Sequence, residues 1–145
     1  MKVGDFLSAR RRPVITIGPD ETVYAAIQKL VANNIGALPV CDNKGVMSGI
    51  ISERDILRLC VQRADKLHDA KVKDVMTRKV VVGVSDDELD YVMNIMTGEG
   101  IRHLPIMEGP KLVSIISARD VIEVRLEECR IDVRYLSDYI SGGYV

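Results

Sequence analysis

Apolar residues follow two different periods along this chain, and the periods alternate. A short apolar run at 14–17 comes first, and apolar residues at helical spacing follow over 19–34. Two further apolar runs, at 35–41 and 46–51, flank the turn sequence DNKG, which predicts a β-hairpin. A second helical pattern begins at Ser52. The first half of the chain therefore predicts the order β-α-β-β-α.

The same order of elements returns in the second half of the chain. It comprises an apolar run at 79–84, a helical pattern from 86 to 96, a hairpin around the turn sequence EGPK and a helix from Ser117. The residue identities repeat as well, because IISERD at 50–55 recurs as IISARD at 115–120. Matching segments that keep their order indicate a duplicated unit.

Two more segments align between the halves, in the same order as the hexapeptides. VGDFLS at 3–8 falls on VKDVMT at 72–77, and IGALPV at 35–40 falls on IRHLPI at 101–106. A unit of this length buries little apolar surface alone, so two units are expected to share one core. The predicted fold class is α/β (α+β), with two β-α-β-β-α repeats packed sheet to sheet around a pseudo-twofold axis. Such a pair leaves two equivalent clefts between the repeats.

The chain is therefore expected to divide into three parts, namely repeat 1 (1–68), repeat 2 (69–128) and a C-terminal helix and tail (129–145). The tail predicts a helix to about Ile140, and two glycines stop it there. Its apolar stripe either crosses a dimer interface or packs onto its own subunit. The residues concerned are Gly142 and Gly143 at the stop, and Val133, Leu136 and Ile140 in the stripe.

Composition narrows the class of protein. The chain has 145 residues, 47% of them hydrophobic, and a formal net charge of -1, so nothing attracts it to nucleic acid or to an anionic membrane. It contains no apolar window long enough to span a bilayer and no apolar leader, which favours a cytoplasmic protein. Its three cysteines never form CxxC, so we expect neither a disulfide framework nor a metal site.

The S-x-R-D motif at the start of the second helix in each repeat admits two interpretations. Serine followed three positions later by an acidic residue is the pattern of a helix capping box, and capping alone can account for it. The same helix start also offers free N–H groups to a phosphate, and an ionised carboxylate can accept from both hydroxyls of a ribose. The arginines suit phosphate oxygens, solvent or a dimer contact equally. The residues are Ser52, Arg54 and Asp55, then Ser117, Arg119 and Asp120.

An I-x-x-L-P strand, a second hydrophobic strand and S-x-R-D stand in this order in both repeats. With these motifs the chain resembles a tandem pair of cystathionine β-synthase (CBS) domains, a stand-alone Bateman module, from Val3 to about Glu128. The resemblance implies a sensor of adenosyl ligands such as AMP, ATP or NAD(H), without a catalytic cofactor. It also implies a homodimer that signals to a protein that the sequence does not identify.

The resemblance further implies that the motif aspartate contacts ribose, while adenine lies in a slot built from the short strands of the other repeat. The primary cleft is then expected to consist of Thr16, Ile35, Ala37, Pro39, Arg102, His103, Ser117, Arg119 and Asp120. The secondary cleft is expected to consist of Val82, Gly83, Ile101, Pro105, Ser52, Arg54 and Asp55.

Arg102 and His103 distinguish the two clefts, because Gly36 and Ala37 stand at the equivalent positions of repeat 1. His103 is either an exposed strand residue or a pH-sensitive group at the rim of a phosphate site. On the second interpretation, the cleft of Asp120 has the wider adenine slot and the additional cations. We therefore expect it to bind its ligand more tightly than the other cleft.

Three classes of function remain open. The first is a non-catalytic regulatory module that binds adenine nucleotides, and the second is a structural dimerisation module whose clefts stay empty. The third is a small nucleotide-acting enzyme. Against an enzyme, the chain contains no G-x-S-x-G, no G-x-G-x-x-G after a strand, no P-loop and no histidine pair for a metal. The regulatory module is the function that the sequence favours.

Overall fold

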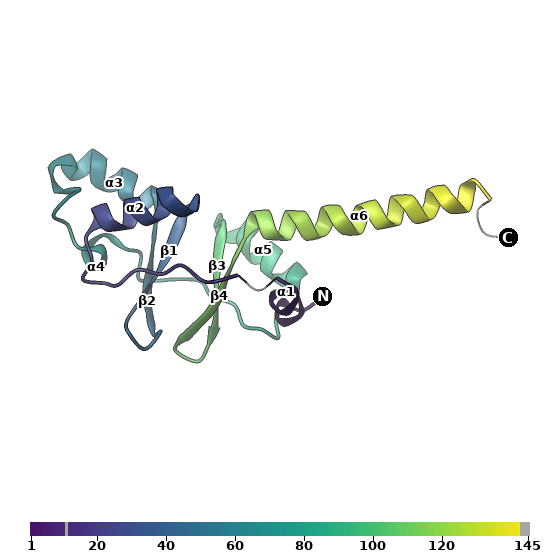
Figure 1. Ribbon diagram of the computed structural model, residues 1–145, viewed down its shortest axis with the longest axis horizontal. Helices are drawn as coiled ribbons and strands as arrows, with labels where there is room; N and C mark the ends of the chain where they lie inside the picture. Colours follow the sequence, from purple (N-terminus) through teal and green to yellow (C-terminus); the bar gives the residue numbers. More distant parts are fainter. Residues whose placement is uncertain (11, 143–145) are drawn as a thin grey trace.

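The computed structural model describes residues 1–10 and 12–142, and it contains the two repeats (Figure 1). Repeat 1 consists of α1 (Val3–Ala9), α2 (Val23–Asn33), β1 (Ala37–Cys41), β2 (Met47–Ser52), α3 (Glu53–Arg63) and the 3-10 turn η1 (Ala64–Lys66). Repeat 2 consists of α4 (Val72–Val75), α5 (Leu89–Glu99), β3 (His103–Glu108), β4 (Lys111–Ser117) and α6 (Ala118–Ile140). The mixed helix and strand class predicted from the sequence is confirmed.

Each repeat contains one antiparallel hairpin, as the sequence predicts, but the strand expected before it is reduced to a single parallel bridge. Ile17 pairs with Val40 in repeat 1, and Gly83 pairs with Ile106 in repeat 2. The next hydrogen bond of each ladder would be donated by the N–H of residue 39 or 105. Both residues are prolines, which have no N–H, so the ladder ends after one bridge.

The two hairpins lie side by side at the centre of the molecule, with the helices outside them (Figure 1). Their turns are joined by backbone hydrogen bonds, from Met47 N to Pro110 O over 3.3 Å and from Leu112 N to Gly45 O over 3.1 Å. The repeats are therefore held together at the hairpin turns as well as through their side chains.

The expectation of one shared core is wrong, because the buried residues form two clusters. Val3 and Phe6 of α1 belong to the cluster of repeat 2, where they lie with residues such as Leu104. Val72 and Met76, at the start of repeat 2, belong to the cluster of repeat 1. Each repeat thus completes its core with the first helical segment of the other. This exchange holds the two repeats together, because neither core is complete without the segment from the other repeat.

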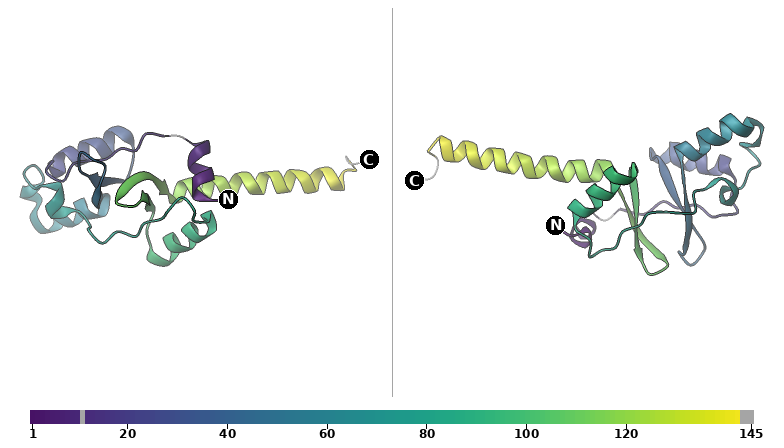
Figure 2. Two further views of the ribbon diagram at one scale, coloured as in Figure 1. Left: turned by 90° about the horizontal axis from the view of Figure 1, so that it is seen from below. Right: turned by 180° about the vertical axis from the view of Figure 1, so that it is seen from behind.

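The C-terminal helix α6 begins beside α5 and then projects away from both repeats (Figure 2). It ends at Ile140, and Gly142 follows with a φ of 74°, as predicted. Gly143, the other predicted stop residue, and Arg11 lie outside the described residues. Within residues 1–10 and 12–142, no helix combines the length and the apolar character needed to cross a membrane.

Candidate functional site

The capping-box interpretation of S-x-R-D is confirmed at both positions. Ser52 caps α3, and Asp55 accepts a hydrogen bond from the Ser52 backbone N–H at 2.9 Å. Ser117 caps α6, and Asp120 accepts from the Ser117 N–H at 2.9 Å. Both aspartates are buried, with exposed fractions of 6% and 4%. Because burial disfavours a charged carboxylate, each needs further hydrogen-bonding or charged partners.

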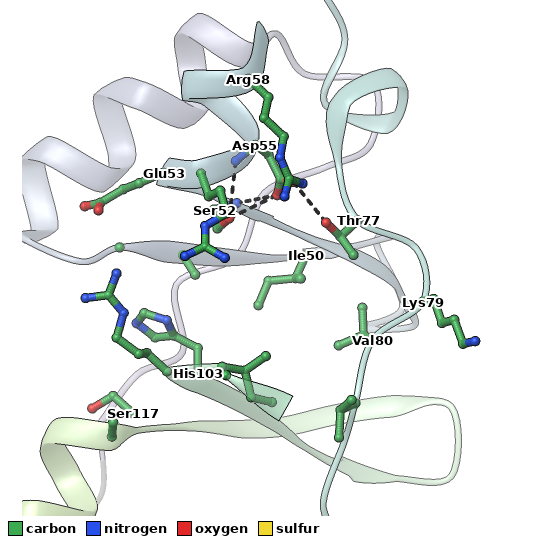
Figure 3. A pocket seen from close by; sticks show the side chains of 18 of the residues that line it. Ile50, Ser52, Glu53, Asp55, Arg58, Thr77, Lys79, Val80, His103 and Ser117 are labelled. Atoms are coloured by element: carbon green, nitrogen blue, oxygen red, sulfur yellow. Dashed lines mark hydrogen bonds and ion pairs between the residues drawn. The ribbon is translucent and has the colours of Figure 1, made fainter. Parts of the chain in front are cut away.

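A cavity of about 520 Å³ lies between the repeats, in front of Asp55 (Figure 3). Repeat 1 supplies the motif residues of its α3, and repeat 2 supplies the loop before β3 and the linker before α5. The lining residues are Gly36, Ala37, Ile50, Ser52, Glu53, Arg54, Asp55, Arg58, Thr77, Lys79, Val80, Val81, Gly100, Ile101, Arg102, His103, Ser117, Ala118 and Arg119.

Thr77 is the second partner of Asp55 and comes from the other repeat. Its hydroxyl donates to Asp55 Oδ1 at 2.9 Å, while Ser52 N and Oγ donate to Oδ2. The linker is held in place by paired backbone hydrogen bonds between Ile50 and Thr77. Gly49 permits this close approach, because a Cβ there would lie 2.7 Å from the Thr77 carbonyl oxygen. The carboxylate of Asp55 is therefore fixed from both repeats.

The cavity combines an apolar side with a cationic rim. Ile50 and Val80 lie together on one side in Figure 3, and Val81 and Ile101 extend the apolar lining. Five lining side chains are cationic and two are acidic, which gives a formal charge of 5 - 2 = +3 without the histidine. They are Arg54, Arg58, Lys79, Arg102 and Arg119 against Glu53 and Asp55. An apolar surface beside concentrated positive charge suits a ligand with a flat apolar part and an anionic part.

Asp120 has a different partner from its equivalent in repeat 1. The guanidinium of Arg12 donates from Nη2 to Asp120 Oδ1 at 2.6 Å. Arg12 is 61% exposed, whereas Asp120 is buried beneath it. One oxygen of the Asp120 carboxylate is thus already engaged by a cation of the same chain.

The repeat alignment explains this difference between the two clefts. Extending the match of 3–8 with 72–77 places Arg12 opposite Val81, which lines the cavity at Asp55. A residue that forms part of the apolar wall in one cleft is therefore an arginine in the other. This single difference removes apolar surface and supplies the ion pair with Asp120.

The cavity draws on both sets of predicted site residues. From the secondary set it contains Ser52, Arg54, Asp55 and Ile101, and from the primary set Ala37, Arg102, His103, Ser117 and Arg119. Its lining does not include Thr16, Ile35, Pro39, Asp120, Val82, Gly83 or Pro105. Of the repeat 2 residues in the secondary set, only Ile101 lines this cavity. The predicted tighter binding at Asp120 stays a prediction.

Sequence reasoning missed Thr77, Arg58, Val80 and Val81 as site residues. For Thr77 a signal was present, because the alignment of 3–8 with 72–77 places a hydroxyl residue, serine or threonine, at the end of both segments. Only Thr77 reaches a motif carboxylate, since Ser8 instead donates to the Gly4 carbonyl. For the two valines no signal existed, because the linker's path determines what they line.

His103 lies half-buried in the cavity wall, so of the two alternatives left open by the sequence, the structure favours a cavity-lining group over an exposed strand residue. Burial, and next the neighbouring Arg102, lower the pKa of His103 below its ordinary value of 6.5. The imidazole of His103 is therefore protonated at a higher pH in the unfolded chain than in the folded chain.

This shift predicts a pH-dependent stability. The contribution of neutral His103 is fully present above the unfolded pKa and is lost as pH falls through and below about 6.5. We expect the free energy of unfolding to decrease between about pH 7 and pH 5, and His103→Gln to lose part of that decrease. Urea denaturation of both proteins at the two pH values measures it. Identical pH dependence in the two proteins would exclude His103 as the cause.

Comparison with known proteins identifies the domain type. The CBS domain family model matches residues 3–62 and 72–127. The mitochondrial CBS domain-containing protein CBSX3 of Arabidopsis thaliana is 33% identical over 129 residues, which cover 86% of this chain and 63% of that protein. This chain therefore spans somewhat less than two thirds of that relative.

Solved structures agree with this match. The CBS-domain protein ATU1752 of Agrobacterium tumefaciens is 38% identical with a TM-score of 0.79, over 86% of this chain and 99% of that one. The structure of CBSX2 in complex with AMP is 27% identical with a TM-score of 0.76, over 87% and 96% of the two chains. Two matched domains, in the order and at the positions of the two repeats, show that this chain belongs to the CBS domain family as a tandem pair.

Proposed function

We propose that this chain is a non-catalytic regulatory module that binds an adenine nucleotide, such as AMP, ATP or NAD(H), in the cavity between its repeats. The observation that carries the proposal is the buried Asp55 carboxylate, which faces a cavity with an apolar side and a cationic rim. The AMP complex of the similar protein CBSX2 supports the ligand class.

The ribose is the part of the ligand that Asp55 recognises. An ionised carboxylate offers about four acceptor positions, and Ser52 N, Ser52 Oγ and Thr77 Oγ1 use three of them. A ribose hydroxyl donates to the fourth, or replaces the hydroxyl of Thr77. Because Asp55 is fixed by the helix start and by the linker, it loses little freedom when the ligand binds.

The base and the phosphates of the nucleotide contact two different surfaces of the cavity, one apolar and one cationic. Adenine packs against the apolar side formed by Ile50, Val80, Val81 and Ile101. The phosphates lie toward the arginines of the rim and the N-terminus of α3, whose free N–H groups favour an anion. Ligand binding alters contacts between the two repeats, and this change is the signal passed to a partner protein.

We propose that the second cleft, at Asp120, is closed by Arg12 in the unliganded protein. The ribose of a second nucleotide requires the oxygen that Arg12 engages at 2.6 Å. The cavity at Asp55 needs less rearrangement, since its hydrogen-bond partner Thr77 is neutral and its space is already open. Arg58 also pairs with Asp55 Oδ1, but at 4.0 Å, which is longer than a hydrogen bond. These observations favour Asp55 over Asp120 as the first site to be filled.

A thermal-shift panel of AMP, ADP, ATP, NAD, NADH and S-adenosylmethionine tests the proposal. A ligand that binds only the folded chain stabilises it by about 2.7 kcal/mol at one hundred times its Kd. We expect at least one adenine ligand to raise the Tm and GTP to raise it much less. No shift with any nucleotide would support the structural dimerisation module instead, and turnover of ATP or NADH would support an enzyme.

A further inference from the structure

The distal half of α6 carries apolar residues that its own subunit does not cover. The CBS domain match ends at residue 127, whereas the helix continues to Ile140. In Figures 1 and 2 this segment extends beyond the repeats. The sequence left open whether the apolar stripe of the tail packs onto its own subunit, and the exposure of Val133, Leu136 and Ile140 excludes that alternative. Exposed apolar residues in such a row mark an interaction surface.

The row follows a coiled-coil period. Its members are spaced alternately four and three residues apart over almost the whole helix, and all are exposed. They are Ile122, Leu126, Cys129, Val133, Leu136 and Ile140, and we call them the α6 seam. Alternating intervals of four and three residues define the a and d positions of a heptad repeat. The opposite side of the proximal helix, with Val121 and Val124, is buried in the core of repeat 2.

We propose that the α6 seam forms an antiparallel coiled coil with the seam of a second copy of this chain. The residues that flank the seam select this partner and this direction. Glu123 and Arg130 occupy e positions, and Arg125 and Asp132 occupy g positions. In an antiparallel pair, e positions face e positions and g positions face g positions.

One antiparallel register, which pairs the seam over residues 122–133, makes all the charged flanking pairs attractive. Leu136 and Ile140 then extend past the seam of the second copy, toward the start of its α6. This register places Leu126 opposite Cys129 of the second copy and Ile122 opposite Val133 of the second copy. Glu123 then faces Arg130, and Arg125 faces Asp132, and the twofold axis repeats each pair. A parallel pair instead places Arg125 against Arg130 of the second copy on both sides, which is repulsive.

The charges needed for these pairs are available. In the part of the chain that the structure describes, Arg130 and Asp132 form no ion pair within the subunit. Glu123 pairs with Arg10 and Arg119, and Arg125 pairs with Asp90 and Glu128. The side chains of Glu123 and Arg125 nevertheless remain 48% and 42% exposed. A self-complementary pattern of this kind fits a second copy better than an unrelated helix. The inference does not depend on nucleotide binding.

Sedimentation equilibrium of the full chain over a range of micromolar concentrations tests the seam with two matched variants. Val133→Asp places a charge in the seam, and we expect it to raise the dimer Kd by about tenfold or more. Ile131→Asp introduces the same charge on the same helix, and the exposed fractions of the two wild-type side chains are similar, 66% and 60%. Ile131 lies outside the seam, so we expect Ile131→Asp to leave the Kd nearly unchanged.

Helix direction is tested by Arg130→Glu, for which the two arrangements predict opposite signs. In the antiparallel pair this variant sets two carboxylates against each other, the new one and that of Glu123 of the second copy, and so weakens association. Adding Glu123→Arg to the same chain restores the attraction. In a parallel pair Arg130→Glu instead relieves repulsion from Arg125 and strengthens association.

Arg134→Glu, outside the flanking positions, is the control for net charge. We expect it to change the dimer Kd much less than Arg130→Glu does, although both variants alter the charge of the chain equally. A monomer at all concentrations, equal effects of the two aspartate variants, or stronger association of Arg130→Glu would overturn the proposal.

Discussion

Replacing Asp55 by asparagine is expected to weaken AMP binding about tenfold or more. The substitution removes the negative charge of the carboxylate that accepts hydrogen bonds from the ribose hydroxyls. A hydrogen bond to a charged group contributes roughly 1.5 to 3 kcal/mol, and 1.4 kcal/mol corresponds to a factor of ten. Asparagine keeps the size of the side chain and one oxygen acceptor. The interaction with the Ser52 N–H can therefore persist, so the expected loss is mainly in affinity.

Asp120→Asn is the matched control for this variant. Asp120 occupies the same position of an equivalent capping box and is equally buried, but its carboxylate faces Arg12 instead of the open cavity. We expect Asp120→Asn to destabilise the protein about as much as Asp55→Asn does, and to leave the tighter AMP event nearly intact. Calorimetric titration of AMP into both variants measures this. The opposite ranking would support the assignment made from the sequence, in which Asp120 belongs to the tighter cleft.

Replacing Arg12 by glutamine is expected to reveal a second AMP site for each chain, with an affinity about tenfold or more above its value in the wild-type protein. In the wild type, a ribose can bind Asp120 only after the Arg12 ion pair has broken, and a charged hydrogen bond of this kind contributes roughly 1.5 to 3 kcal/mol. Because Arg12 is largely exposed, its truncation should leave the cores unchanged. The stoichiometry of a calorimetric titration reports the result.

Arg10→Gln provides the control for charge in the same segment. Arg10 donates to Glu123 at 3.0 Å and lies over the ring of Phe6, so it is engaged without touching Asp120. We expect this variant to retain the wild-type stoichiometry. Weaker binding after Arg12→Gln would indicate that Arg12 holds the phosphates of a nucleotide, and the idea of a closed second cleft would then be wrong.

The sequence by itself determined the repeat architecture, because its evidence is local. The two strands of each hairpin flank a turn sequence that only a few backbone conformations accommodate. The capping boxes at Ser52 and Ser117 need residues only three positions apart. Where a local signal met a long-range constraint, the prediction was less accurate. The strand expected at 14–17 became a single bridge, since Pro39 cannot donate the next hydrogen bond of the ladder.

The tertiary structure alone decided which residues of the two repeats meet. No local sequence feature of residues 3–9 indicates that α1 completes the core of the distant repeat 2. An apolar helix face can pack against any apolar surface of suitable shape. The same holds for Thr77 at Asp55 and Arg12 at Asp120, which are joined only by the paths of the linkers. The sequence predicted unequal clefts from Arg102 and His103. Only the tertiary structure showed that the linker residues Thr77 and Arg12 also give the two motif aspartates different partners.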